Sequence, residues 1–288
     1  MLCRRPVLAL VFAGLLSLPA KGYGEDNRAD IAEVNGAKLY YEMVGEGQPL
    51  VLIHGGGLDR RMWDEQFQMF AEHSRVIRYD VRGYGKSEAS HKPYASAEDL
   101  YGLLQFLQVE KADIVGLSLG GRIAVDLALT HPEVVNLLIP VAPGLSGFQF
   151  SAKHNQEMIE LVNVAQEDGE TRAVELWLQN PYMKPGMENP TVGQRIRSIA
   201  MENAQVWLMA PLERPLSPPA INRLSEIHAP TLIIVGDRDI PDIQKIARTL
   251  ETGIPGAKKV VIHGAGHMVN MEKPEEFNRV VLEFLSKR

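Results

Sequence analysis

The stretch Asp113-Ile-Val-Gly-Leu-Ser-Leu-Gly-Gly-Arg122 carries the strongest indication of fold in this chain. A short β-branched run ends at Val115, residues 116–120 fit the pattern G-x-S-x-G, and residues 122–129 carry apolar side chains at helical spacing. Glycines on both sides of a serine let a strand and a helix pass closely, in a strained turn that exposes the hydroxyl. The pattern therefore predicts a nucleophile at Ser118. The alternative is an ordinary strand-to-helix turn without a chemical role.

A serine nucleophile needs a base and an orienting acid, and both follow strands further along the chain. A serine hydroxyl reacts slowly at neutral pH until a base takes its proton. The β-branched run 231–235 leads into Gly-Asp237-Arg-Asp239, and the run 258–262 leads into His263-Gly-Ala-Gly-His267. Groups that follow parallel strands meet at one edge of the sheet, where Ser118 also emerges. The order Ser, Asp, His predicts a catalytic triad.

A glycine-rich loop upstream is suited to stabilising an oxyanion. Residues 49–53 form an apolar run that leads into His54-Gly-Gly-Gly57, where side chains would block a close approach to the backbone. We expect the two oxyanion donors to be the N–H groups of Gly56 and Leu119. The His54 ring is expected to brace this loop. A phosphate-binding loop is the alternative, but neither Gly-Lys-Ser/Thr nor G-x-G-x-x-G is present.

With these motifs in this order, the chain resembles the α/β-hydrolase superfamily. The matching segments are residues 54–57, 79–87, 116–120, 236–239 and 266–268. Within the superfamily it looks most like small bacterial esterases and enol-lactonases of the 3-oxoadipate enol-lactonase type, with aryl esterases and cofactor-free haloperoxidases close by. The resemblance implies that Asp239, third after the glycine, orients His267. Asp237 remains the alternative acid, and His263 is interpreted as the end of a strand.

The resemblance also bears on the chemistry. Epoxide hydrolases and haloalkane dehalogenases of this fold have an aspartate at the position of Ser118. Carbon–carbon bond hydrolases of ring-cleavage products commonly have an aromatic residue after the histidine, where this chain has Met268. Asp80 and Arg82 match a turn of the family that is expected to hold loops near the site. An esterase or lactonase is favoured, and a perhydrolase, a carbon–carbon bond hydrolase or a binding protein without turnover remain alternatives.

Hydrophobic periodicity predicts an α/β fold with a mostly parallel eight-stranded sheet and helices on both faces. Strands are expected near residues 30–35, 38–44, 50–54, 75–80, 112–117, 134–141, 231–236 and 258–263. Helices are expected near residues 62–72, 96–108, 119–130, 241–252 and 274–286. We assign residues 25–144 and 223–288 to the hydrolase core and residues 145–222 to an inserted helical cap. The cap helices are expected near residues 152–167, 170–179 and 191–209.

Large apolar side chains in the cap predict a roof over the substrate pocket. We name Trp177, Met183 and Trp207 as pocket residues, although packing inside the cap is an alternative for each. Met158, Met201 and Met209 belong to the same group. Together they favour a substrate with an apolar acyl or aryl group.

The first 24 residues are typical of a secretory signal peptide. Arg4 and Arg5 precede an apolar run over residues 7–16, which is shorter than the roughly 20 residues of a membrane span. Stable membrane insertion is therefore not expected, and we expect export to the periplasm or medium. The single cysteine, Cys3, would leave with the peptide. Cleavage removes three positive charges and takes the formal net charge from −6 to −9, which disfavours nucleic acid as a partner.

The sequence lacks the common metal and cofactor motifs, which favours a reaction that uses only side chains and water. The histidines lack the H-E-x-x-H spacing, and no nicotinamide, flavin or pyridoxal fingerprint is present. We therefore expect neither a metal nor a cofactor. With 45% hydrophobic and 23% charged residues, the 288-residue chain has enough apolar content for one sizeable core.

Overall fold

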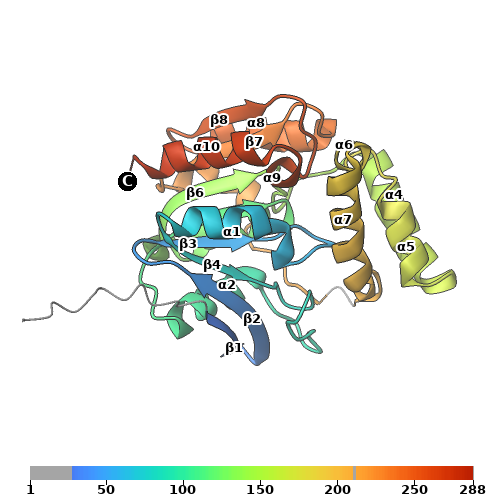
Figure 1. Cartoon of the computed structure of the whole chain (residues 1–288), viewed down its shortest axis with the longest axis horizontal. Helices are drawn as coiled ribbons and strands as arrows, with labels where there is room; N and C mark the ends of the chain where they lie inside the picture. Colours follow the sequence, from blue (N-terminus) through green and yellow to red (C-terminus); the bar gives the residue numbers. More distant parts are fainter. Residues whose placement is uncertain (1–27, 210–211, 288) are drawn as a thin grey trace, which may run out of the picture.

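The centre of the protein is a sheet of eight strands in the spatial order β1-β2-β4-β3-β5-β6-β7-β8 (Figure 1). The computed structural model describes residues 28–209 and 212–287. The strands are β1 (Arg28–Val34), β2 (Ala37–Val44), β3 (Pro49–Ile53), β4 (Arg75–Tyr79), β5 (Ala112–Leu117), β6 (Val135–Val141), β7 (Leu232–Gly236) and β8 (Lys258–Ile262). The pairs β1–β2 and β2–β4 are antiparallel, and the other pairs are parallel. The predicted opening hairpin and mostly parallel sheet are confirmed.

Burial along the strands follows from their place in the sheet. Every residue of β5 and β7 is buried, because central parallel strands are covered on both faces. Their side chains are apolar except for Asp113 of β5, which accepts a hydrogen bond from Asn136. In the antiparallel β2, by contrast, Ala37, Leu39 and Tyr41 are buried, while Lys38 is exposed and Tyr40 is half-buried. That alternation is expected for a strand with one face toward solvent.

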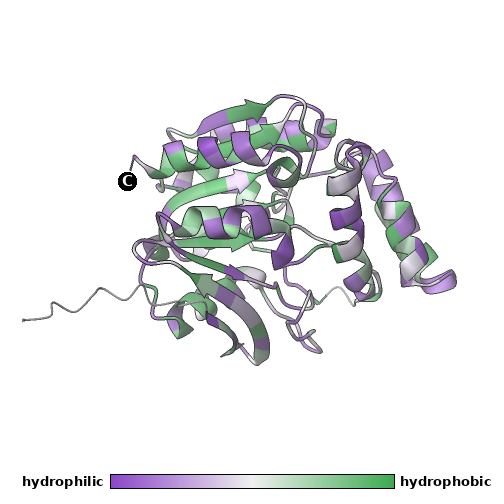
Figure 2. Ribbon diagram, viewed as in Figure 1, coloured by the Kyte–Doolittle hydropathy of each residue, from purple (hydrophilic) through white to green (hydrophobic). Residues whose placement is uncertain are grey.

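Helices cover both faces of the sheet, as predicted. They are α1 (Asp64–Ala71), α2 (Ser96–Phe106), α3 (Leu119–Thr130), α8 (Pro241–Gly253) and α10 (Pro274–Leu285). Helix α1 packs against α10 on the face nearer the viewer in Figure 1, and α2 packs against α3 on the other face. In α8 the buried side chains Ile243, Ile246 and Leu250 recur at helical spacing. Figure 2 shows the consequence, with apolar strands enclosed by helices that alternate between polar and apolar residues.

The described residues between β6 and β7 include four α-helices beside the carboxyl ends of the parallel strands (Figure 1). These helices are α4 (Ala152–Glu167), α5 (Glu170–Trp177), α6 (Lys184–Glu188) and α7 (Pro190–Glu202). A 3-10 helix, η3 (Ala204–Leu208), follows α7. Residues 1–24, which we interpret as a signal peptide, lie outside the described residues.

Three details of the helices differ from the sequence prediction. The single helix expected over residues 191–209 is wrong, because α7 ends at Glu202 and a 3-10 helix follows. Between them, the buried Asn203 donates from Nδ2 to Asp59 Oδ2 at 2.8 Å and accepts at Oδ1 from the Gly85 N–H at 2.7 Å. These long-range bonds hold Asn203 in a turn that helical periodicity does not reveal. The short helices α6 and α9 (Val269–Glu272) were also not predicted.

Candidate active site

Ser118 lies at the sharp turn between β5 and α3 in a conformation that non-glycine residues rarely adopt. Its φ is 54° and its ψ is −105°, which stores strain on the order of 1–3 kcal/mol. The flanking glycines are required by close backbone contacts. A Cβ on Gly116 would lie 2.2 Å from the Gly120 carbonyl oxygen, and a Cβ on Gly120 would lie 2.3 Å from the Ile53 carbonyl oxygen. The turn therefore depends on glycine at both positions.

His267 and Asp239 are brought together by the loops that follow β8 and β7. Nδ1 of His267 lies 2.8 Å from Oδ2 of Asp239, and both side chains are buried. The other Asp239 oxygen, Oδ1, accepts the backbone N–H of Ile240 at 2.7 Å. The carboxylate is thus held on both oxygens, and it directs the histidine's Nδ1 proton away from the cavity.

The backbone on both sides of His267 is held by a carboxylate that the sequence analysis did not single out. Glu272 accepts the N–H of Gly266 at 2.6 Å and the N–H of Met268 at 3.0 Å. Burial raises the pKa of Glu272, although these two hydrogen bonds act to lower it. The only sequence signal is its position five residues after the histidine, on a helix too short to predict. Glu272 therefore fixes the loop that carries the imidazole.

The alternative acid and the alternative histidine pair with each other near the surface. His263 Nδ1 lies 2.9 Å from Asp237 Oδ2, and Oδ1 of Asp237 accepts the Gly264 N–H at 2.7 Å. The His263 side chain is 83% exposed. The hydrogen bond from His263 lowers the pKa of Asp237. Asp237 thus pairs with His263, whereas Asp239 pairs with His267, so the geometry favours Asp239 over Asp237 as the partner of His267.

The glycine-rich loop after β3 is fastened by a buried histidine. His54 Nε2 accepts the Val81 N–H at 2.9 Å, which leaves Nδ1 to donate to the Gly55 carbonyl oxygen at 2.8 Å. Burial lowers the pKa of His54, so the ring is neutral at pH 7. With both nitrogens occupied and no exposed surface, the ring braces the loop and has no free nitrogen for catalysis.

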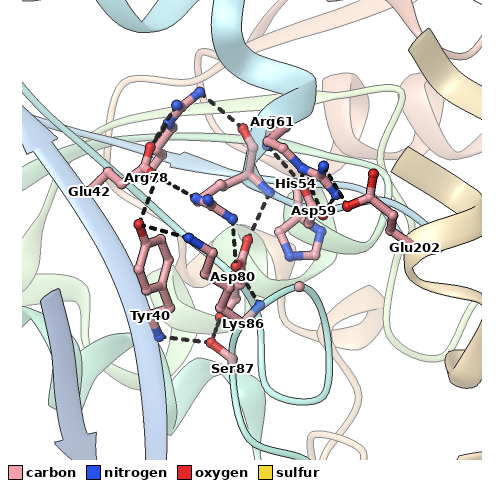
Figure 3. Close-up of polar contacts among 12 residues, drawn as sticks. Tyr40, Glu42, His54, Asp59, Arg61, Arg78, Asp80, Lys86, Ser87 and Glu202 are labelled. Carbon is pink, nitrogen blue, oxygen red and sulfur yellow. Dashed lines mark hydrogen bonds and ion pairs between the residues drawn. The ribbon is translucent and has the colours of Figure 1, made fainter. Parts of the chain in front are cut away.

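An ion-pair network fixes the turn after β4 and ties it to the insert (Figure 3). The buried Asp80 accepts the Arg60 N–H at 3.0 Å, the Arg60 guanidinium at 2.9 Å and the Lys86 N–H at 2.9 Å. Nearby, Asp59 binds the Arg61 guanidinium at 2.6 Å, and Arg61 also reaches Glu202 of α7 at 2.8 Å. These contacts join the glycine-rich loop to α7.

The charge of Asp59 is maintained although the carboxylate has no exposed surface. Burial acts to raise its pKa, but hydrogen bonds from Arg61 and Asn203 outweigh that cost and lower the pKa of Asp59 to about 2. Arg82, at the other end of this turn, forms a bidentate ion pair with Asp99. Its Nε donates to Oδ2 and its Nη2 to Oδ1, both at 2.7 Å. These buried pairs hold loops beside the site and take no part in the cavity wall.

Ser118, His267, Gly56 and Leu119 line one cavity of about 350 Å³ between the sheet and the insert. Trp177 and Trp207 also line it, with ring centroids 5.9 Å apart. The rest of its wall is mainly apolar and aromatic. It includes Gly57, Tyr84, Arg122, Gly144, Leu145, Phe150, His154, Met158, Tyr182, Val206, Ile240, Ile243 and Met268.

Met183 is the exception among the pocket residues named from the sequence. Its side chain is fully buried, and it does not line this cavity. Met183 stands in the turn before α6, where its N–H donates to the Asn180 carbonyl oxygen at 2.9 Å and its side chain joins the hydrophobic core. Tyr182, one residue earlier, lies in the wall instead, with its ring 5.1 Å from that of His267.

Comparisons with known proteins agree with this architecture. The model of the alpha/beta hydrolase family matches residues 50–280. The chain belongs to this family. It is 29% identical over 267 residues to the 2-hydroxy-6-oxo-6-phenylhexa-2,4-dienoate hydrolase of Comamonas testosteroni, covering 87% of this chain and 92% of that protein. It is 30% identical to the pimeloyl-[acyl-carrier protein] methyl ester esterase of Vibrio cholerae, covering 86% and 98% of the two chains.

A similar solved structure is the enol-lactonase from Burkholderia xenovorans LB400. It superposes with a TM-score of 0.74 at 28% identity, over 89% of this chain and all of that one. In residues 28–209 and 212–287 no helix has the length and apolar character needed to cross a membrane. The same residues contain no group of three or more His, Cys, Asp or Glu side chains placed to hold a metal ion.

Proposed function

We propose that this hydrolase-family protein cleaves a carboxylic ester or lactone through an acyl-enzyme intermediate on Ser118. The observation that carries the proposal is the placement of Ser118 and His267 in one cavity, with His267 hydrogen bonded to the buried Asp239. A strained serine on a turn, in one cavity with an imidazole oriented by a carboxylate, supports nucleophilic acyl transfer. No metal or cofactor enters the proposed steps.

In the proposed mechanism, Nε2 of His267 takes the proton of Ser118 as Oγ attacks the carbonyl carbon. Asp239 holds the Nδ1 proton and stabilises the imidazolium. The N–H groups of Gly56 and Leu119 bind the oxyanion, and each contributes about 3 kcal/mol in comparable enzymes. His267 then protonates the leaving alkoxide. The same imidazole activates water, which attacks the acyl-enzyme and releases the acid.

The wall of the cavity supports a substrate with an apolar acyl or aryl group. Trp177, Trp207 and Tyr182 supply aromatic surface, and Phe150 and Met158 add further apolar area. Arg122, a cationic side chain in the wall, is paired with Glu213 at 2.7 Å and Asp126 at 3.3 Å. Its charge is therefore compensated, which favours a neutral small molecule over an anionic substrate or nucleic acid.

Purified protein is to be tested on p-nitrophenyl esters of increasing acyl length, aryl acetates and lactones. We expect steady-state turnover, with higher kcat/KM for apolar acyl groups. Ligand-stabilised melting without steady-state hydrolysis would instead support a binding protein of the same fold.

A second candidate is hydrolysis of a carbon–carbon bond, favoured by the similarity to the Comamonas testosteroni hydrolase. That protein's name specifies a 2-hydroxy-6-oxo-6-phenylhexa-2,4-dienoate, whose phenyl group would suit an aromatic cavity wall. The residue after His267 is Met268, which lines the cavity as an aliphatic group. Disappearance of the dienoate's visible absorbance on adding enzyme, at a kcat/KM above that for aryl esters, would favour this candidate.

We also propose that the protein is exported after cleavage near residue 22 or 24. Support comes from the basic residues and the short apolar run at the start of the chain. Cleavage would leave a chain without cysteine, so activity should be the same with and without reductant. N-terminal sequencing of the protein from periplasm and medium tests this. Active protein found only in cytoplasm with Met1 retained would contradict export and leave the catalytic proposal unaffected.

A further inference from the structure

Tyr84 is held rigidly beside the glycine-rich loop by its own backbone. The Tyr84 N–H donates to the Val81 carbonyl oxygen at 2.9 Å, and the Tyr84 carbonyl oxygen accepts the Ser87 N–H at 2.9 Å. The next residue, Gly85, donates its N–H to Asn203 at 2.7 Å. The backbone of Tyr84 is therefore fixed on both sides, which sets the direction in which its side chain leaves the turn.

The ring of Tyr84 reaches from this turn to the catalytic cavity. It contacts the buried His54 ring edge-to-face, with centroids 5.1 Å apart. Tyr84 lines the catalytic cavity and also a second cavity, which Tyr94 lines as well. The ring is therefore part of the wall between the two cavities, and its hydroxyl lies at the far end from the turn.

The hydroxyl lies close to Gly56, one of the two residues whose N–H groups we assign to the oxyanion. A Cβ built on Gly56 would meet two neighbours, the Tyr84 hydroxyl oxygen at 3.8 Å and the Leu119 Cβ at 3.9 Å. Burial affects the pKa of Tyr84 most, and the Gly57 backbone N–H acts in the opposite direction, as a donor to the hydroxyl oxygen. Burial raises the pKa of Tyr84, so the hydroxyl keeps its proton at neutral pH. With an N–H donated to its oxygen, the hydroxyl's own proton is available to an acceptor.

We propose that the Tyr84 hydroxyl is a third hydrogen-bond donor to the oxyanion, beside the N–H groups of Gly56 and Leu119. The inference rests on the proposed acyl-transfer function. A hydroxyl donor that is fixed before the reaction stabilises negative charge as it develops on the carbonyl oxygen. Its contribution is therefore greatest in the tetrahedral transition state and small for the planar substrate.

The test is Tyr84→Phe, which keeps the ring on His54 and removes only the hydroxyl. Tyr94→Phe is the matched control, because it removes a hydroxyl from the second cavity and not from the catalytic one. For a p-nitrophenyl ester we expect Tyr84→Phe to lower kcat about 100-fold with KM changed less than threefold. Tyr94→Phe should stay within twofold of the wild type in both constants.

Inhibition separates a catalytic role from a structural one. An aryl boronic acid forms a tetrahedral adduct with a serine, whereas the carboxylic acid product is planar. We expect Tyr84→Phe to weaken boronic acid inhibition at least 10-fold and product inhibition less than twofold. An unchanged kcat in Tyr84→Phe, or an equal loss of affinity for both inhibitors, would overturn the inference about Tyr84. The proposed function would still stand in that case, provided that the wild type turns over esters. A wild type without turnover would overturn both together.

Discussion

Nδ1 of His267 lies 2.8 Å from Oδ2 of Asp239, and both side chains are buried. This contact fixes which nitrogen of the imidazole carries the proton, because a carboxylate accepts and cannot donate when ionised. Nε2 is thereby left free on the ring that lines the cavity with Ser118. The pairing of Asp237 with His263 at the surface gives a natural internal comparison, since it is a second Asp–His contact of almost the same length.

Asp239→Asn should lower kcat by roughly 10⁴-fold, as in serine proteases where the amide selects the wrong imidazole tautomer. Asp237→Asn removes the same charge from the surface pair and should lower kcat less than about threefold. Steady-state hydrolysis of a p-nitrophenyl ester measures both variants, and thermal melting confirms that each is folded. A larger loss for Asp237→Asn would mean that the acid has been misassigned.

Gly116→Ala should destabilise the protein strongly, because its methyl group would lie 2.2 Å from the Gly120 carbonyl oxygen. Backbone on both sides prevents a small adjustment, so we expect a loss of about 3 kcal/mol in the free energy of unfolding. Gly144→Ala is the control, since its methyl group would meet its neighbours at 3.5 Å, an ordinary contact distance. Urea denaturation of both variants is the measurement. Equal stability would contradict the close packing described for the turn.

The ionised Asp59 carboxylate stabilises the fold, and we expect this contribution to be lost when the carboxylate is protonated in acid. Its pKa is lowered to about 2 in the folded state from 3.8, so its contribution is present above about pH 4 and is lost as the pH falls from about 4 to 2. The shift corresponds to about 2 kcal/mol. Asp59→Asn should therefore lower the free energy of unfolding at pH 7 by about that amount and reduce its decline in acid.

Urea denaturation at pH 7, 5 and 3 measures this effect. Asp168→Asn, at an exposed position after α4, serves as the control and should follow the wild type at each pH. If the free energy of unfolding falls between pH 7 and pH 3 as much in Asp59→Asn as in the wild type, the Asp59 carboxylate does not cause the loss of stability in acid.

The sheet and its order of motifs could be predicted because they leave local patterns in the sequence. The turn at Ser118 needs glycines at fixed spacing, and central strands such as β7 need continuous apolar runs. Both requirements act within ten residues and are therefore visible without a structure. The hydrolase family assignment follows from the same segments.

The parts that could not be predicted depend on contacts between distant residues. Asn203 ends α7 through bonds to Asp59 and Gly85, more than 100 residues away. Met183 and Tyr182 are adjacent large residues in one turn, and only tertiary packing determines that Tyr182 faces the cavity. Periodicity identifies which residues are apolar, but it does not orient side chains in a short irregular segment.

The most direct test of the account is the reaction of Ser118 with a fluorophosphonate probe, followed by intact-protein mass spectrometry. We predict one covalent adduct on the wild type, located at Ser118 by peptide mapping, together with complete loss of ester hydrolysis. Ser118→Ala should show no adduct, less than about 0.1% of wild-type turnover and a nearly unchanged melting temperature. Labelling at another residue, or turnover of more than a few per cent in Ser118→Ala, would contradict the proposed nucleophile.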